Sequence, residues 1–120
     1  MAQILVVDDL EQDSQALVAV LRQAGYDVII ARSGEEGIEM ALKHKPNLIL
    51  MDVVLPGISG FQATRKITKH PEISHIPVII VSSKSTETDK VWGLRQGAKD
   101  YFTKPVDKKA ILPTIKTLLG

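Results

Sequence analysis

Short apolar runs alternate along this chain with longer stretches in which apolar residues recur every three or four positions. The short runs are rich in β-branched residues, a pattern that favours strands. They span Gln3–Val7, Asp27–Ala31, Asn47–Met51, Val78–Val81 and Asp100–Phe102. The first, third and fourth runs are almost wholly apolar, as expected for central parallel strands that are buried on both faces. The second and fifth are mixed, which suits the two edges of a sheet.

One apolar stripe with helical spacing follows each predicted strand. The stripes run through Ala16–Ala24, Gly37–Leu42, Gly60–Ile67, Val91–Ala98 and Ile111–Leu119. In the fourth stripe, Val91 and Leu94 are expected to face the sheet. Asp107 is a candidate cap for the last helix, in which Pro113 predicts a bend without ending the helix. Strict alternation of strand and helix predicts an α/β fold of five βα units, with a parallel sheet and helices on both faces.

Polar residues follow four of the five predicted strands. They are Asp8 and Asp9 after the first strand, Asp52 after the third, Ser82 after the fourth and Lys104 after the fifth. Parallel strands present their carboxyl ends at one edge of the sheet, where such folds bind ligands. Three carboxylates gathered there would repel one another unless a cation lay among them. Oxygen ligands without His or Cys indicate Mg²⁺, with Mn²⁺ as the alternative.

This set of residues suits the transfer of a phosphoryl group to a carboxylate. Asp52 ends the central strand and is the natural nucleophile, while the metal ion, Lys104 and Ser82 would hold the phosphoryl oxygens. Each residue alone also has a plain structural explanation. The Asp8-Asp9 pair and Ser82 could be helix caps, Asp52 could belong to a turn, and Lys104 could be a solvated lysine. The phosphoryl site is favoured because all of them occur together, in order, after the right strands.

Four motifs resemble those of the receiver domains of two-component response regulators, the CheY-like family. They are ILVVDD at Ile4–Asp9, LILMDVVLPGISG at Leu48–Gly60, IPVIIVSS at Ile76–Ser83 and GAKDYFTKP at Gly97–Pro105. The resemblance extends along the chain and implies one receiver domain over residues 1–120. It also implies a flavodoxin-like, doubly wound fold with the strand order 2-1-3-4-5.

The resemblance assigns a role to each candidate residue. Asp52 is implied to be the phosphoacceptor. The implied metal ligands are Asp9 and Asp52 directly, Asp8 mostly through water, and the backbone carbonyl of Val54. Lys104 is implied to contact the phosphoryl group and to form a cis bond with Pro105. Ser82 and Tyr101 are implied to be the switch pair.

Two further segments, Gly60–Lys69 and Glu87–Asp107, are similar to the stand-alone regulators of twitching-motility systems, the PilH type. Such a regulator takes a phosphoryl group from a CheA-like histidine kinase and catalyses only its own phosphorylation and dephosphorylation. The output surface would combine the fourth helix, the fifth strand and the fifth helix, including Trp92 and Tyr101. Its partner would be a protein of pilus-based motility, chemotaxis or phototaxis. Trp92 is either a binding residue there, or it packs onto Tyr101 or the stem of a lysine and covers a groove.

Composition narrows the classes of function. Lys and Arg total 15 against 14 Asp and Glu, so the chain lacks the basic excess typical of a nucleic-acid-binding protein. It has no cysteine, which excludes disulfides and thiolate metal sites. No apolar run approaches the roughly 20 residues needed to cross a bilayer, and the N-terminus does not resemble a signal peptide. We therefore expect a cytoplasmic monomer that neither binds nucleic acid nor inserts into a membrane.

Three alternatives stay open at this stage. The chain could act as a phosphate sink for a kinase, or it could be a receiver domain cut from a longer regulator. An Asp-nucleophile phosphohydrolase is the third, although such enzymes usually carry a second acid at the position of Val54. A nucleotide-binding module is disfavoured, because no glycine-rich phosphate-binding sequence follows the first strand.

Overall fold

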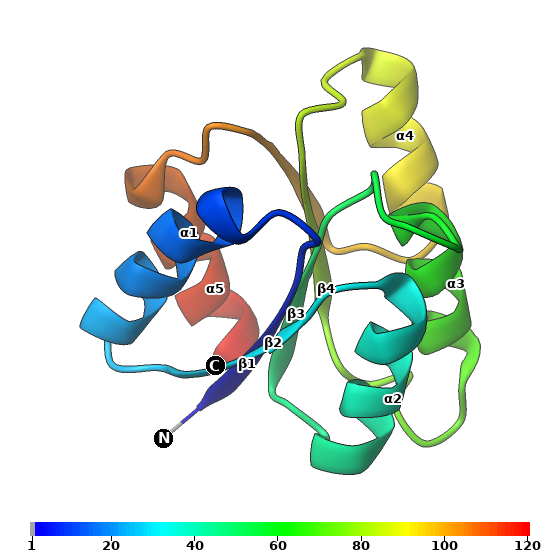
Figure 1. The fold of residues 1–120 in the computed structure, drawn as a ribbon, viewed down its shortest axis with the longest axis horizontal. Coiled ribbons are helices and arrows are strands. Elements are labelled where there is room, and N and C mark those ends of the chain that lie inside the picture. The colour runs from blue at the N-terminus through cyan, green and yellow to red at the C-terminus, as the bar shows by residue number, and fades with distance from the viewer. Residues whose placement is uncertain (1) are drawn as a thin grey trace.

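A five-stranded parallel sheet forms the centre of the computed structural model, which describes residues 2–120 (Figure 1). The strands are β1 (Gln3–Val7), β2 (Asp27–Ala31), β3 (Leu48–Met51), β4 (Val78–Ser82) and β5 (Asp100–Thr103). They pair in the order β2-β1-β3-β4-β5, so the two mixed runs lie at the edges. The predicted fold class and strand order are confirmed, and β3, β4 and β5 each differ from the predicted strand by one residue at one end.

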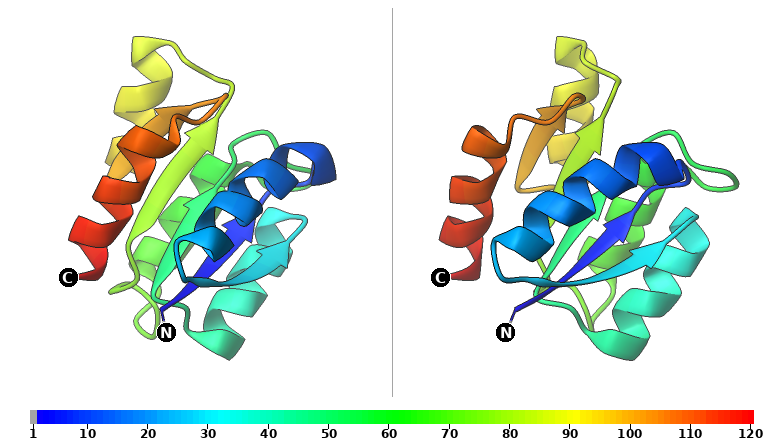
Figure 2. Two further views of the ribbon diagram at one scale, coloured as in Figure 1. Left: turned by 90° about the vertical axis from the view of Figure 1, so that its left-hand side faces the viewer. Right: turned by 60° about the vertical axis from the view of Figure 1, so that its left-hand side comes forward.

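Helices cover both faces of the sheet, as Figures 1 and 2 show. They are α1 (Glu11–Gln23), α2 (Gly34–His44), α3 (Gly60–Lys69), α4 (Glu87–Arg95) and α5 (Lys108–Leu119). Alternate side chains of β1 point to opposite faces: Ile4 packs with residues of α1 and α5, whereas Leu5 packs with residues of α2 and α3. A hydrophobic layer therefore lies on each face of the sheet and joins it to the helices on that side.

Local capping explains where most helices begin. Ser59 and Thr86 each form a capping box at the start of α3 and α4. Asp107 caps α5 as expected, accepting a hydrogen bond from the Lys109 amide at 2.9 Å. The helix continues through Pro113 to Leu119, also as expected, while a bend at the proline stays a prediction.

The predicted orientation of α4 is wrong. Val91 and Leu94 are 42% and 48% exposed, and the residue turned to the sheet is Gly93. A β-carbon at Gly93 would lie 2.8 Å from Cδ1 of Ile80 and 3.0 Å from Cδ2 of Tyr101. The missing side chain lets α4 approach the sheet closely, and the larger apolar residues then turn outward.

Candidate functional site

The three acidic residues predicted to bind metal lie together at the carboxyl edge of the sheet. Asp8 and Asp9 follow β1 and Asp52 follows the neighbouring β3, whose backbone pairing continues as the Asp52 amide donates to the Val7 carbonyl at 2.9 Å. One carboxylate oxygen from each acid lies within 4.8 Å of the others. Asp8 and Asp52 are buried, whereas Asp9 is exposed. The pairing of adjacent strands thus builds an acidic cluster that is open on one side.

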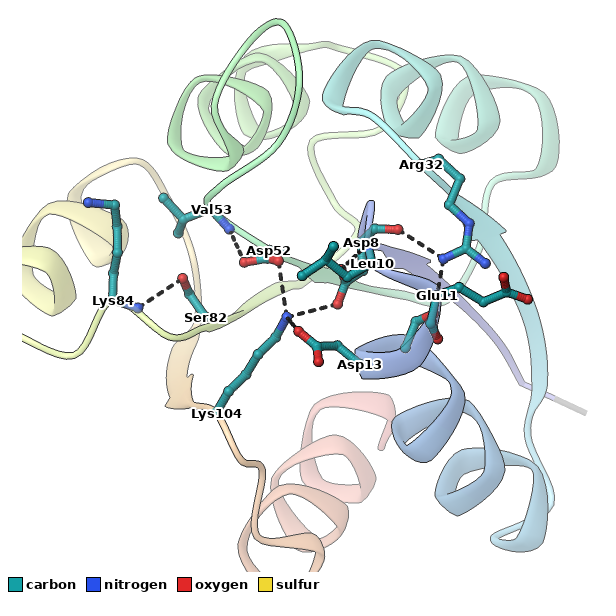
Figure 3. A network of polar contacts seen from close by, with 11 residues as sticks. Asp8, Leu10, Glu11, Asp13, Arg32, Asp52, Val53, Ser82, Lys84 and Lys104 are labelled. Atoms are coloured by element: carbon teal, nitrogen blue, oxygen red, sulfur yellow. Dashed lines mark hydrogen bonds and ion pairs between the residues drawn. The ribbon is translucent and has the colours of Figure 1, made fainter.

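Lys104 lies directly beside this cluster, as Figure 3 shows. Its ammonium Nζ is 2.9 Å from Asp8 Oδ2 and 3.0 Å from Asp52 Oδ2. A third carboxylate, Asp13 of α1, lies 3.2 Å from the same nitrogen. The peptide bond between Lys104 and Pro105 is cis, as expected.

Burial and charge oppose each other in this group. Burial raises the pKa of the Asp52 carboxyl, and the nearby Lys104 ammonium only partly offsets this. Burial alone would lower the pKa of Lys104, but its hydrogen bonds to Asp8 and Asp52 outweigh that effect and raise it. Lys104 contacts three carboxylates and Asp9 adds a fourth to the cluster, so negative charge exceeds the single positive charge of the ammonium.

That excess, and the chemistry of the donors, fit a hard divalent cation. Carboxylate oxygens with neither His nor Cys among them are the ligands that Mg²⁺ prefers. Asp8, Asp9 and Asp52 would hold the ion, which would neutralise charge on a bound phosphoryl group. The Val54 carbonyl as a further ligand stays a prediction, as does binding of Mn²⁺.

The backbone around Asp52 is closely packed on the side opposite Lys104. The Val53 amide donates to Asp52 Oδ1 at 2.7 Å, as Figure 3 shows. A β-carbon on Gly60 would lie 1.8 Å from the Asp52 carbonyl oxygen, so only glycine fits where α3 begins. The loop between β3 and α3 is therefore held against the candidate acceptor.

The predicted switch residues are connected through a residue that the sequence did not single out. Ser82 is fully buried, and its Oγ accepts a hydrogen bond from the Lys84 amide at 3.2 Å. The carbonyl of Lys84 accepts a hydrogen bond from the Tyr101 hydroxyl at 2.5 Å. Tyr101 is 8% exposed, and burial raises the pKa of its hydroxyl. Both bonds of Lys84 come from its backbone, so its residue type gave no signal.

Asp13 is the other residue that the sequence analysis missed. It lies on the first turn of α1, four residues after Asp9, where an acidic residue is common for reasons of helix electrostatics alone. Only the path of the loop after β1 brings this carboxylate to Lys104.

Comparison with known proteins identifies the family. Residues 4–116 match the response regulator receiver domain. The chain belongs to the response-regulator receiver family. Receiver domains take part in two-component signalling, where histidine kinases phosphorylate them and they act on downstream partners. They bind Mg²⁺ at an acidic pocket, which here corresponds to the cluster of Asp8, Asp9 and Asp52.

Individual relatives agree with this assignment. The receiver is 53% identical to protein PilH of Pseudomonas aeruginosa over 120 residues, which cover 100% of this chain and 99% of that protein. It is 38% identical to the response regulator PleD of Caulobacter vibrioides, of which it spans 26%.

Solved structures show the same fold. A putative response regulator from Chloroflexus aurantiacus superposes with a TM-score of 0.94 at 33% identity, covering 98% of this chain and 97% of that one. The receiver domain of the sensor histidine kinase PA1611 from Pseudomonas aeruginosa superposes with a TM-score of 0.91 at 28% identity, covering 99% and 98%. That structure contains a magnesium ion coordinated in the active-site cleft. Within residues 2–120 of this receiver, no helix has the length and apolar character needed to cross a membrane.

Proposed function

We propose that this receiver accepts a phosphoryl group from a histidine kinase on Asp52, with Mg²⁺ held by Asp8, Asp9 and Asp52. The observation that carries the proposal is the contact of 3.0 Å between the Lys104 ammonium and Asp52 Oδ2, at the edge of the acidic cluster. Nucleophile, cation and metal-binding carboxylates thereby share one small space. Ser82, at the end of β4 beside β3, completes the set of groups that would surround a phosphoryl group.

The transfer consists of one bond exchange. A carboxylate oxygen of Asp52 forms a new bond to phosphorus, while the bond between phosphorus and the imidazole nitrogen of the donor breaks. The imidazole keeps the electron pair and takes up a proton from water. Lys104 would then balance charge on one phosphoryl oxygen, and the Ser82 hydroxyl would donate to another.

The identity of 53% to PilH along nearly the whole of that protein supports a role in pilus-based motility. In this proposal the receiver works in the cytoplasm with a CheA-like kinase. It would signal to a motility protein through the surface formed by α4, β5 and α5. Three large apolar side chains of α4 are exposed: Val91, Trp92 and Leu94.

Phosphorylation tests the acceptor directly. Acetyl phosphate or a phosphorylated CheA-like kinase, with Mg²⁺, should add one phosphoryl group to the wild-type chain, as read by intact mass. Asp52→Asn should abolish the gain, because the amide is not a nucleophile for phosphorus. Asp27→Asn, an exposed acid at the start of β2, is the matched control and should label like the wild type. Labelling of Asp52→Asn at the wild-type rate would place the acceptor elsewhere.

A further inference from the structure

Lys104 has no free donor within the part of the chain that the structure describes. An ammonium group carries three N–H donors. Its nitrogen lies within hydrogen-bond distance of three carboxylates: Asp8 at 2.9 Å, Asp52 at 3.0 Å and Asp13 at 3.2 Å. A phosphoryl oxygen on Asp52 can therefore bind Lys104 only if one of these contacts is given up.

The three carboxylates differ in how easily they can leave. The Asp8 side chain is 6% exposed, so losing the ammonium would leave its charge in a poorly hydrated place. Asp52 would carry the phosphoryl group itself, so it stays beside the ammonium in either state. The Asp13 side chain is 43% exposed, makes the longest of the three contacts and is not part of the acidic cluster. It also lines a cavity of about 270 Å³ between α1 and α5, which gives a released carboxylate access to water.

We propose that Asp13 competes with the phosphoryl group for Lys104. With Asp52 unmodified, Asp13 occupies the third donor of the ammonium. When the phosphoryl group is present, one of its oxygens takes that donor and Asp13 turns to solvent. Asp13 is thus a positioning residue that acts through Lys104, and it lowers the occupancy of the phosphorylated state. This inference rests on the proposed function of Asp52.

Beryllofluoride, a phosphoryl mimic that binds an aspartate without hydrolysis, provides the test. Its affinity for the Mg²⁺-loaded chain is measured by calorimetry in the wild type, Asp13→Asn and Glu11→Gln. Glu11 lies on the same first turn of α1 and makes no contact with Lys104 among the described residues, so it controls for the loss of one negative charge. Asp13→Asn should bind about twofold to fivefold more tightly than Glu11→Gln, the range expected for a partly exposed ion pair.

Two further measurements distinguish competition for Lys104 from a role of Asp13 in holding Lys104 in place. The affinity for Mg²⁺ alone should change equally in Asp13→Asn and Glu11→Gln, because Asp13 does not touch the metal-binding cluster. Asp13→Glu keeps the charge and should return beryllofluoride affinity towards the wild-type value. Unchanged or weaker beryllofluoride binding in Asp13→Asn would overturn the inference, since Asp13 would then only hold Lys104 in place. Failure of the wild-type chain to bind beryllofluoride would instead contradict the proposed function.

Discussion

At the scale of single residues, the site keeps a carboxylate where ionisation is unfavourable. Burial is the largest influence on the Asp52 carboxyl, and it raises the pKa of that group despite the adjacent Lys104 ammonium. A raised pKa in the folded state means that the full stability is present below the unfolded pKa and is lost as pH rises through the folded one. In the absence of metal, the ionised Asp52 therefore destabilises the fold at neutral pH.

Asp52→Asn should accordingly stabilise the metal-free protein. At pH 7 with a chelator present, we expect its free energy of unfolding to rise by about 1 kcal/mol, the usual order of a single-substitution effect, because the neutral amide avoids the cost of a buried charge. Lys104 keeps two partners, Asp8 and Asp13, so its charge stays compensated. Urea unfolding gives this value, and the gain should shrink towards pH 4 as the wild-type Asp52 becomes protonated.

With Mg²⁺ present, the wild type should become more stable than Asp52→Asn. The ion gains a ligand from Asp52 and should stabilise the wild type more than Asp52→Asn, since binding to the folded state adds to its stability. Asp27→Asn, which removes an exposed acid, should stay within about 0.5 kcal/mol of the wild type throughout. A loss of stability in metal-free Asp52→Asn at pH 7 would show that the contact with Lys104 outweighs the cost of burial.

At the scale of elements, α4 shows how a glycine sets the orientation of a helix. Gly93 faces Ile80 and Tyr101 with no space for a side chain, although glycine in a helix interior costs about 1 kcal/mol relative to alanine. A glycine inside a predicted helix therefore indicates, from the sequence alone, that close packing requires it at this position.

Gly93→Val should destabilise the protein by about 1–2 kcal/mol in urea unfolding, because the added methyl groups overpack the contact between α4 and the sheet. Val91→Ala is the matched control on the same helix. Val91 is 42% exposed, so its truncation should change stability by less than about 0.5 kcal/mol. A larger loss for Val91→Ala than for Gly93→Val would restore the orientation expected from the sequence.

The helices and strands were predictable because each layer of a parallel α/β fold has its own pattern of apolar residues in the sequence. Buried strands give continuous apolar runs, and helices give stripes. The rotation of α4 was not predictable from its stripe, since the close approach at Gly93 outweighs the apolar side chains of Val91 and Leu94.

The site was predictable to the extent that it follows from strand ends. Asp8, Asp9, Asp52, Ser82 and Lys104 all end or follow strands, and parallel pairing alone brings them to one edge. Asp13 and Lys84 escaped prediction for a different reason. The position of Asp13 beside Lys104 depends on how the loop before α1 turns. Lys84 takes part only through its backbone amide and carbonyl, which every residue type has.

At the scale of the whole molecule, a continuous series of contacts joins the site to α4. Ser82 binds the backbone of Lys84, which binds the Tyr101 hydroxyl, and the Tyr101 ring lies against Gly93. A second route runs through Val53, whose amide binds Asp52 and whose side chain belongs to the same small cluster as Tyr101. The route through Val53 starts at Asp52 itself, and the route through Ser82 would join it once the Ser82 hydroxyl binds a phosphoryl group on Asp52.

Trp92 offers a direct measurement of that coupling. It is the single tryptophan of the chain and is 50% exposed, so its emission responds to small changes in its surroundings. Beryllofluoride with Mg²⁺ should draw the Ser82 hydroxyl towards Asp52, weaken its bond to the Lys84 amide and alter the support of α4 by Tyr101. We expect a change in tryptophan fluorescence that saturates with beryllofluoride in the wild type, is absent in Asp52→Asn and is much smaller in Ser82→Ala. Ser83→Ala, at the exposed neighbour of Ser82, should behave like the wild type. If emission stays constant while calorimetry shows saturation, the two paths do not move α4, and the proposed output surface loses its physical link to Asp52.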